Sequence, residues 1–471
     1  MAVRGAGPGA RLLSGWCFGI AQLSLGVLFV LQFSALGYLV LVVIEALFFA
    51  LAALLTPTRC SAPALCGALA LAEWAREHVP FGGLPPGGLP LTAAASPYSA
   101  LARLGGPALL SLAICATGVG VALLVEAVTM RVGGSQGLWW GGATLAGVAL
   151  VVAVGAAAPN GGPASRHIQA VAVQGGGARG LGQISTPSVG AFGRTYEEAV
   201  GLDRHVQLEL WPEDTVPLLE GTKGPESSAL GQGVGTLARS LHATVLAGVT
   251  EPVGKRSFLN EVVAFEPSGE VSGSIEKVHP VPFGEYVPLR SFLGRFVGLA
   301  AVPRDALAGH NDGLLRTAAG PIGVLISYET FYPSRGRTSV RAGAEVLVTP
   351  TNTASYSSSQ VPAQELAATR LQAIATGRDV LQAATTGYSA LVAPSGEVLE
   401  RTGLGEGGLL FAMLPLRSGL TPFDRFGELP SIVLALLLVL ASWLRALLRG
   451  RRGALRDQGA SASTAPIPSE A

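Results

Sequence analysis

The stretch from Pro321 to Pro333 places polar side chains at the end of a short apolar run. Its sequence, Pro-Ile-Gly-Val-Leu-Ile-Ser-Tyr-Glu-Thr-Phe-Tyr-Pro, predicts a buried strand that ends in Ser327, Tyr328 and Glu329. Buried strands read as continuous apolar runs, and in α/β sheets ligands bind beyond the carboxyl ends of the strands. We therefore expect chemistry at this point, with the Ser327 hydroxyl as the candidate nucleophile.

Two charged side chains elsewhere in the chain match that chemistry. Glu213 follows a predicted strand that ends at Leu210, although an isolated acid in such a place is more often a helix cap or a solvated residue. Lys277 is one of three lysines among 32 basic residues, which indicates that a compact ammonium is needed there. Such an ammonium can donate to an oxyanion or shift its pKa, and Glu213 places a carboxylate just beyond a strand end.

The elements that would position these residues alternate between strands and helices. Short apolar and β-branched runs predict strands at 168–174, 206–210, 244–249, 259–265, 322–326, 345–349 and 389–393. Helical patterns lie near 228–242, 335–343 and 362–377. This alternation predicts an α/β domain whose helices cover its sheets. Two copies of Pro-Ser-Gly-Glu-Val, at 267–271 and 394–398, each follow a predicted strand and indicate hairpin turns in two similar sheets.

The composition of the whole chain indicates a membrane protein. The 471 residues are 49% hydrophobic and 13% charged, which is too apolar for an ordinary soluble protein. The net charge of +1 offers no argument for nucleic acid as a partner. The four cysteines all lie in the first third of the chain and mostly inside apolar runs, so they read as packing residues and not as a disulfide or metal site.

Apolar segments predict five membrane spans before the α/β region and one after it. They lie at 15–33, 36–55, 62–75, 106–128 and 138–158, and the last begins near Leu429. With this count Arg4, Arg11, Arg59, Arg131 and the arginine cluster after the last span fall on one side of the membrane, which is the cytoplasmic side because cytoplasmic loops retain positive charge. We therefore expect transmembrane helices over 1–160, an extracytoplasmic α/β domain over 161–428, a C-terminal transmembrane helix over 429–449 and a disordered cytoplasmic tail over 450–471.

The segment 79–106 is rich in Pro and Gly and is expected on the outer side of the membrane. Two interpretations of it remain open. In one it is a flexible connector. In the other it is a partly buried loop beneath the outer domain, where it shapes the path by which lipid or substrate reaches the site.

The polar residues lie in motifs that resemble a known family. Trp-Pro-Glu ending at Glu213, then Lys277 with Val-Pro-Phe-Gly-Glu-Tyr-Val-Pro at 281–288, then a nucleophile followed by Tyr-Glu, is similar to the nitrilase superfamily of carbon-nitrogen hydrolases. Members of that superfamily have an αββα sandwich fold and a Glu-Lys-Cys triad. The spans on both sides and the 281–288 motif narrow the resemblance to the apolipoprotein N-acyltransferases, as do Glu-Trp-Ala-Arg at 73–76 and Pro-Phe-Gly-Gly at 80–83.

The resemblance implies a two-step acyl transfer outside the cytoplasmic (inner) membrane of a bacterium. A phospholipid donates an acyl chain to the nucleophile, and the α-amino group of a diacylglyceryl-modified N-terminal cysteine on a lipoprotein then accepts it. Glu213 would be the general base, Lys277 the group that stabilises the oxyanion, and Ser327 the nucleophile. The supporting residues would be Glu285, Tyr328 and Glu329. The resemblance implies no metal or organic cofactor, and we expect a monomer.

Two features depart from the family. The family's catalytic cysteine is Ser327 here, and no cysteine follows Cys115. A serine hydroxyl is several pKa units more basic than a thiol, which costs a carboxylate base about 1.4 kcal/mol per unit. Serine hydrolases use a histidine base, and the candidate here is His279, two residues after Lys277, but it is interpreted as a loop residue. The family also has eight spans, with its outer domain after the seventh, whereas we count five before the domain in this chain.

Three interpretations of the function follow. The chain is an N-acyltransferase that works through an oxygen ester, a catalytically silent relative that binds lipoprotein or lipid, or a membrane-tethered nitrilase-like amidase. The presence of Glu213, Lys277 and Glu285 favours an enzyme, and the missing thiol favours the silent relative. The amidase interpretation leaves the membrane spans unexplained. We therefore expect the N-acyltransferase.

Overall fold

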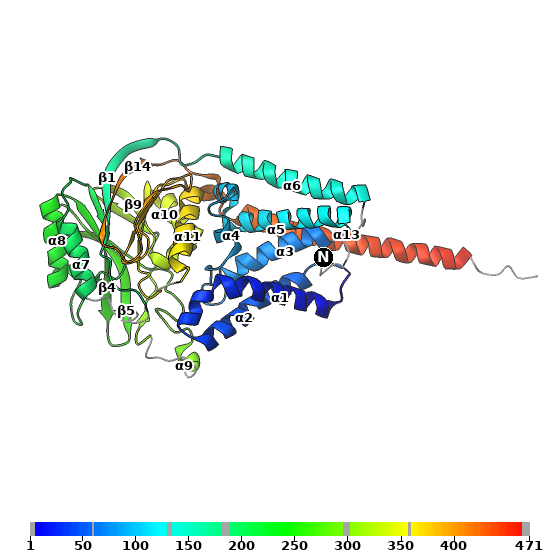
Figure 1. The fold of residues 1–471 in the computed structure, drawn as a ribbon, viewed down its shortest axis with the longest axis horizontal. Helices are drawn as coiled ribbons and strands as arrows, with labels where there is room; N and C mark the ends of the chain where they lie inside the picture. The colour runs from blue at the N-terminus through cyan, green and yellow to red at the C-terminus, as the bar shows by residue number, and fades with distance from the viewer. Residues whose placement is uncertain are drawn as a thin grey trace, which may run out of the picture.

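The computed structural model describes residues 5–58, 61–129, 134–180, 189–294, 302–356 and 359–463. These residues form a bundle of helices and an α/β domain, which lie end to end (Figure 1). The domain follows the fifth long helix of the bundle and precedes the last one, as the sequence predicts.

Six long helices make up the described part of the bundle. They are α1 (Pro8–Gly26), α2 (Ala35–Leu54), α3 (Ser61–Arg76), α5 (Ala102–Thr129), α6 (Gly134–Ala157) and α13 (Leu429–Ser463). Among the described residues, four helical segments are long and apolar enough to cross a membrane: 35–54, 97–129, 134–157 and 429–451. Large apolar side chains such as Leu39, Trp139 and Leu437 are exposed on these helices, as expected of surfaces that face lipid.

The first helix differs from the predicted span at 15–33. It ends at Gly26, and a short 3-10 helix, η1 (Leu28–Gln32), follows it. Gly26 lies against Gly87, and a Cβ atom on Gly26 would stand 2.8 Å from the Gly87 Cα atom. The helix therefore ends where the backbone of the segment 79–106 reaches it.

The last helix is longer than the predicted span at 429–449. It continues to Ser463, into the segment for which the sequence predicts a disordered tail, and residues 464–471 lie outside the described part of the chain. Between 445 and 456 the sequence is mostly Arg, Leu and Ala, which are strong helix formers, and this explains the extension. Figure 1 shows the extension at the end of the bundle remote from the α/β domain.

The α/β domain contains two sheets. The strands of the first are β1 (Ala164–Gln174), β2 (Leu208–Leu210), β3 (Val216–Pro217), β4 (Thr244–Val253), β5 (Ser257–Phe265), β6 (Val271–Glu276), β7 (Asp305–Ala306) and β14 (Gly408–Arg417). Those of the second are β8 (Leu314–Thr317), β9 (Gly320–Val324), β10 (Val346–Thr351), β11 (Val380–Ala384), β12 (Ala390–Val392) and β13 (Val398–Arg401). The first sheet has the order β14-β1-β2-β4-β5-β6, with β3 beside β4 and β7 beside β5, and the second has the order β13-β12-β11-β10-β9-β8. Each sheet has a parallel centre, formed by β1, β2 and β4 in the first and by β9, β10 and β11 in the second.

Apolar side chains from both sheets fill the space between them. Leu210 and Leu246 of the first sheet share one buried cluster with Val324 and Val348 of the second. The outer face of the first sheet is covered by α7 (Val189–Val200) and α8 (Ala229–Leu241), and that of the second by α10 (Pro333–Ala342) and α11 (Val361–Thr376) (Figure 1). This arrangement confirms the predicted αββα sandwich.

The two Pro-Ser-Gly-Glu-Val turns lie where the sequence predicts them. One joins β5 to β6 and the other joins β12 to β13. Gly269 has a φ of 83° and Gly396 a φ of 81°, the left-handed region in which only glycine is unstrained. The two sheets therefore each contain a hairpin with the same turn sequence.

The segment 79–106 joins the bundle to the second sheet. It folds into α4 (Leu89–Thr92) and η2 (Pro97–Leu101), and many of its side chains are buried. Leu101 packs in one cluster with Leu371 and Ile374 of α11. Other short helices in the described ranges are η4 (Pro225–Ser227), α9 (Arg290–Leu293), η6 (Ser327–Phe331) and α12 (Pro422–Phe426). The packing of this segment favours a partly buried loop beneath the domain over a flexible connector.

Candidate active site

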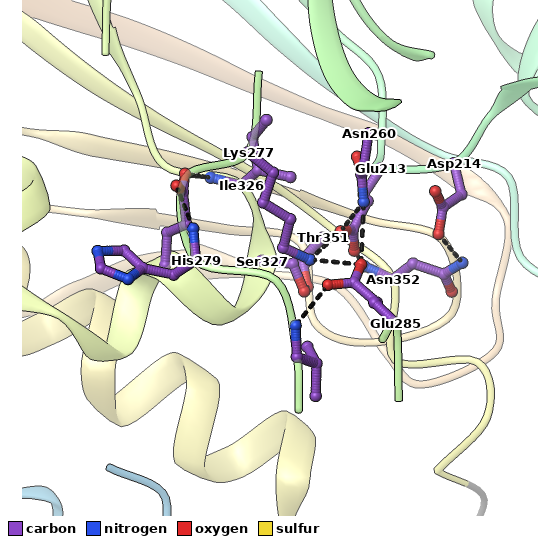
Figure 2. A network of polar contacts seen from close by, with 12 residues as sticks. Glu213, Asp214, Asn260, Lys277, His279, Glu285, Ile326, Ser327, Thr351 and Asn352 are labelled. Carbon is purple, nitrogen blue, oxygen red and sulfur yellow. Dashed lines mark hydrogen bonds and ion pairs between the residues drawn. The ribbon is translucent and has the colours of Figure 1, made fainter. Parts of the chain in front are cut away.

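Lys277 lies between two carboxylates. Its Nζ atom donates to Glu213 Oε1 at 2.7 Å and to Glu285 Oε1 at 2.8 Å. The Nδ2 atom of Asn260, on β5, donates to the same two oxygens at 2.8 and 3.1 Å. Lys277 is 1% exposed and Glu213 is 4% exposed, so this ion pair is excluded from water. Figure 2 shows the four side chains converging on one point.

Glu213 is held in place by backbone contacts with both sheets. It lies in the turn after β2, and the turn packs on Gly248 of β4, where a Cβ atom would stand 2.6 Å from the Glu213 Cα atom. Only glycine allows this approach. On the other side, the backbone N–H of Asn352, just after β10, donates to Glu213 Oε2 at 3.1 Å. A residue of the second sheet therefore fixes an acid that belongs to the first.

The charges in this cluster perturb one another. Burial raises the pKa of Glu213, Asp214 and Glu285 add to the rise, and Lys277 opposes it. Burial lowers the pKa of Lys277, but the two carboxylates beside it outweigh burial, so that its pKa is raised. Lys277 is therefore a fixed ammonium. Within the described ranges, no group of three or more His, Cys, Asp or Glu side chains is arranged to hold a metal ion.

Ser327 begins a sharp turn at the end of a strand. It is the first residue of η6 (Ser327–Phe331), shortly after β9, and its φ is 50°. A left-handed conformation costs a residue other than glycine about 1–3 kcal/mol and persists only where its surroundings fix it. The Ser327 Oγ atom lies 3.3 Å from Oγ1 of Thr351, the last residue of β10, and Thr351 Oγ1 donates to Glu365 Oε1 of α11.

Glu329 links two segments of the site: the turn that begins at Ser327 (the Ser327 turn) and the loop that follows β6 from Lys277 onward (the Lys277 loop). Its Oε2 accepts the N–H of Ile326 at 2.8 Å, directly before Ser327. Its Oε1 accepts the N–H of Val278 at 2.7 Å, directly after Lys277. Glu329 is fully buried, so both bonds are shielded from water. The Glu329 carboxylate thereby binds the backbone next to the candidate nucleophile and the backbone next to the ammonium.

Tyr328 and His279 face away from this cluster. The Tyr328 hydroxyl donates to the Gly83 carbonyl at 3.2 Å, and the Tyr332 hydroxyl donates to the same oxygen at 3.4 Å. The His279 ring stacks on Tyr332 at 4.2 Å between ring centres, and Figure 2 shows it directed away from Ser327. Burial lowers the pKa of His279. His279 is therefore placed as a loop residue, and the base for Ser327 must be sought elsewhere.

A cavity of about 330 Å³ opens beside the Lys277 loop. Its lining includes Phe81, Val278, His279, Pro280, Tyr286 and Tyr332. Phe81 belongs to the segment 79–106, and the other five belong to the α/β domain. The cavity therefore lies between the domain and a loop of the bundle, and its walls are mostly apolar and aromatic.

Four polar residues of the site were not predicted from the sequence: Asn260, Thr351, Asn352 and Glu365. Asn260 is an amide in a strand that is mostly apolar, and such a residue needs a hydrogen-bond partner when it is buried. Thr351 and Asn352 lie just beyond the carboxyl end of the predicted strand at 345–349. Site residues were expected at the same position relative to β9, just beyond its carboxyl end. Glu365 is the one acid in the helical run that begins at Val361. Each of these signals was present in the sequence.

Two family models match the chain. The carbon-nitrogen hydrolase model matches residues 196–419, and the model of the apolipoprotein N-acyltransferase N-terminal domain matches residues 1–120. An apolipoprotein N-acyltransferase of Azotobacter vinelandii is 31% identical over an alignment that covers 96% of this chain and 89% of that protein. This chain belongs to the apolipoprotein N-acyltransferase family. The membership agrees with the resemblance that the motifs indicate.

Another member of the N-acyltransferase family and a solved structure match smaller parts of this chain. An apolipoprotein N-acyltransferase of Geobacter metallireducens is 32% identical over 224 residues, which cover 47% of this chain and 42% of that protein. Among solved structures, an amidase from Nesterenkonia sp. is 22% identical with a TM-score of 0.42, and the match covers 57% of this chain and 98% of that one. Family membership and the four apolar helices together identify a membrane protein of the bacterial inner membrane.

Proposed function

We propose that this chain transfers an acyl chain from a phospholipid to the N-terminal α-amino group of a diacylated lipoprotein, with Ser327 as the nucleophile. The observation that carries the proposal is the convergence of three distant segments. Glu213 and Lys277 are in direct contact, and Glu329 ties the Lys277 loop to the Ser327 turn. The activity for which the Azotobacter vinelandii relative is named then suggests the substrate class.

In the first step, Ser327 Oγ loses its proton to a carboxylate of the site and attacks the carbonyl carbon of a phospholipid ester. The oxyanion that forms is stabilised by the Lys277 ammonium, whose buried position strengthens the interaction. The carbon–oxygen bond to the glycerol then breaks, and the leaving alkoxide takes up the proton. The products are a lysophospholipid and an acyl ester of Ser327.

In the second step, the lipoprotein's α-amino nitrogen attacks the acyl ester. Glu213 acts as the general base and accepts the proton that the amine loses. The bond between the acyl carbon and Ser327 Oγ breaks, and the proton that Glu213 accepted from the amine passes to Ser327 Oγ. Glu285 holds Lys277 from the other side throughout, and its own Oε2 is fixed by the N–H of Val281 at 2.7 Å.

The place of the site suits substrates whose acyl chains stay in a bilayer. The apolar cavity beside the Lys277 loop lies between the domain and the segment 79–106 of the bundle. An acyl chain in this cavity would place its ester near the ammonium without leaving the membrane side of the domain. Tyr328 and Tyr332 support the loop that forms one wall, through their bonds to the Gly83 carbonyl.

We further propose that the domain over 161–428 faces the extracytoplasmic side and that the chain acts as a monomer. The argument for orientation is the charge of α13. Arg445 and Arg449 lie on the part of this helix that extends away from the α/β domain (Figure 1). Positive residues that flank a span remain in the cytoplasm, so the domain at the opposite end belongs outside.

The experiment is to express this chain in cells depleted of their own N-acyltransferase and to follow the N-terminal mass of a model lipoprotein. A third acyl chain that is absent with Ser327→Ala and present with Ser395→Ala supports the proposal, because Ser395 is an exposed serine of the same domain. If the natural chain adds no acyl group while Ser327→Cys does, the proposal is wrong and the chain is a silent relative that binds its ligands without turnover.

A further inference from the structure

The Ser327 hydroxyl is joined to a buried carboxylate that has no role in the reaction described so far. Thr351 Oγ1 lies 3.3 Å from Ser327 Oγ and is hydrogen-bonded to Glu365 Oε1. Glu365 is on α11, on the outer face of the second sheet, and is 2% exposed. The Glu365 carboxylate is therefore connected to the candidate nucleophile through a single hydroxyl group, that of Thr351.

The number of hydroxyl protons limits which oxygen can be the donor in each of these two hydrogen bonds. A threonine hydroxyl has one proton to donate, and an ionised carboxylate can only accept. Thr351 therefore donates its proton to Glu365 and has only lone pairs left for Ser327. The geometry of this structure has Thr351 Oγ1 as the donor toward Ser327 Oγ as well. Ser327 therefore donates to Thr351 only after its hydroxyl rotates, and in that arrangement the three residues form a continuous line along which a proton can move.

Glu213 is placed differently. Its Oε1 accepts from Lys277 and Asn260, and its Oε2 accepts from the N–H of Asn352. Among the described residues, none of the hydrogen bonds to Glu213 comes from Ser327. Glu213 is thus well placed to hold the ammonium and to face an incoming amine. The hydroxyl of Ser327 leads to the other carboxylate.

We propose that Glu365 is a positioning residue for this site: it orients the Thr351 hydroxyl toward Ser327 and receives the Ser327 proton through it. The inference rests on the proposed function, whose first step it completes. As Ser327 Oγ bonds to the ester carbon, its proton passes to Thr351 Oγ1 and the Thr351 proton passes to Glu365. When the glycerol oxygen leaves, the Glu365 proton returns to Thr351 Oγ1 and the Thr351 proton passes to the leaving oxygen, so that charge and protons balance.

The surroundings of Glu365 suit this task near neutral pH. Burial raises the pKa of Glu365 to about 7, while the hydrogen bond from Thr351, the charge of Lys277 and the hydroxyl of Ser327 oppose the rise. The phenol of Tyr356 also faces it. A carboxylate whose pKa lies close to the working pH is the most effective proton acceptor, because it is ionised and yet basic.

The arrangement also accounts for a serine at the nucleophile position. A hydroxyl is several pKa units more basic than a thiol, so it needs a stronger and better aligned acceptor. A cysteine in the same place would need little help from Glu365. The inference therefore predicts that the importance of Glu365 depends on which nucleophile occupies position 327.

The first test measures the reactivity of Ser327 without any lipid substrate. The full chain in mild detergent is treated with an alkyl fluorophosphonate, which bonds to an activated serine oxygen with loss of fluoride, and the labelled peptide is identified by mass. We expect labelling of Ser327 with a rate that rises through pH about 7. Glu365→Gln and Thr351→Val should each lower the rate at least 100-fold, and Glu365→Gln should abolish the rise with pH.

The matched control is Glu209→Gln. Glu209, on β2, is also fully buried, burial raises its pKa to about 7, and it is bonded to Trp211 Nε1 at 3.0 Å. Its loss should leave the labelling rate within threefold of that of the natural chain. If the natural chain is not labelled, or if Glu365→Gln labels within threefold of it, the inference is wrong. Because the probe replaces both substrates, this result stands whether or not a lipoprotein is acylated.

The second test separates a proton-transfer role from a merely structural one. Glu365→Gln is compared in the natural chain and in the Ser327→Cys variant, using the third acyl chain on the lipoprotein as the readout. We expect a loss of at least 100-fold with serine and of less than tenfold with cysteine. Equal losses in the two backgrounds would show that Glu365 only stabilises the fold and would overturn the inference.

Discussion

The two sides of the candidate site are built from different chemistry. The ion-pair arm, which comprises Glu213, Asn260, Lys277 and Glu285, comes from the first sheet and its loops, and its carboxylates are bound by N–H donors. The hydroxyl arm, which comprises Ser327, Thr351 and Glu365, comes from the second sheet and α11. The ion-pair arm thus brings an ammonium and carboxylates into direct contact, whereas the hydroxyl arm connects two neutral hydroxyl groups to the Glu365 carboxylate.

The difference shows how the two tasks of acyl transfer are divided. An ammonium buried between two carboxylates cannot easily give up its proton, so the ion-pair arm provides a fixed positive charge. Hydroxyl groups exchange donor and acceptor roles by rotation, so the hydroxyl arm provides a route for a proton. Asn352 joins the arms, because it follows Thr351 directly and its N–H bonds to Glu213.

Breaking the ion-pair arm should have the largest effect. Lys277→Met removes the ammonium and leaves the charges of buried Glu213 and partly exposed Glu285 with neutral N–H donors only. We expect the free energy of unfolding to fall by about 3–5 kcal/mol, and acyl transfer to fall about 100- to 1,000-fold with the loss of an oxyanion donor. Denaturant titration in detergent and the lipoprotein mass assay measure the two effects.

The control for this change is Lys223→Met, at an exposed lysine of the same domain. It should leave both quantities unchanged. Transfer by Lys277→Met at more than one tenth of the natural rate would contradict the role of the ion-pair arm.

Separating the two arms should have the next largest effect. Glu329→Gln replaces an acceptor of backbone N–H groups from both the Ser327 turn and the Lys277 loop, and it removes an ion pair with Arg335 at 3.4 Å. We expect a loss of about 3 kcal/mol in the free energy of unfolding. Acyl transfer should fall about 100-fold, because misplacing reacting groups by about 1 Å costs that much. Glu397→Gln, at an exposed acid, should change neither value, and an unchanged transfer rate for Glu329→Gln would show that the arms are held together by other contacts.

Displacing one member of the ion-pair arm should have a smaller effect. A methyl group at Gly248 would press on the Glu213 backbone, so Gly248→Ala should move this carboxylate and slow acyl transfer about 10- to 100-fold. Gly233→Ala is the matched change, because the atoms nearest to its new Cβ lie 3.8 and 3.9 Å away and it stands in α8. That variant should keep full activity. Equal activity of the two variants would show that the position of Glu213 is not critical.

Removing the contacts of the hydroxyl arm's turn with the bundle should have the smallest effect. Tyr328→Phe with Tyr332→Phe deletes both hydroxyls that bond to the Gly83 carbonyl. Each such bond contributes about 1 kcal/mol, so we expect unfolding to become easier by about 2 kcal/mol while transfer changes less than threefold. A loss of more than tenfold in transfer would place these tyrosines in the reaction itself.

The sequence predicts the members of the site that stand out by residue type. Lys277 is a rare lysine in an arginine-rich chain, and Ser327 follows a clear buried strand. The ends of elements were harder to predict. The strand predicted at 345–349 stops short of Thr351. No strand is predicted at β11, because two alanines in five residues give it weak β-propensity, and its burial in the sheet fixes it as a strand.

The partners of the site residues depend on how the two sheets pack. Asn352 and Glu213 are far apart in the sequence and touch only because the second sheet lies on the first. Glu365 lies in a helical pattern, and the pattern predicts that it is helical but not that its carboxylate reaches Thr351. Long-range contacts of this kind follow from tertiary packing, which local patterns do not contain.

The most direct test of the account is to look for an acyl group on Ser327. The purified chain in mild detergent is given a phospholipid of defined acyl chain without any lipoprotein, and its peptides are analysed by mass. The account predicts one acyl group on the peptide that contains Ser327, resistant to neutral hydroxylamine as an oxygen ester is, and absent from Ser327→Ala. No adduct on the natural chain, or an adduct that persists in Ser327→Ala, would contradict it.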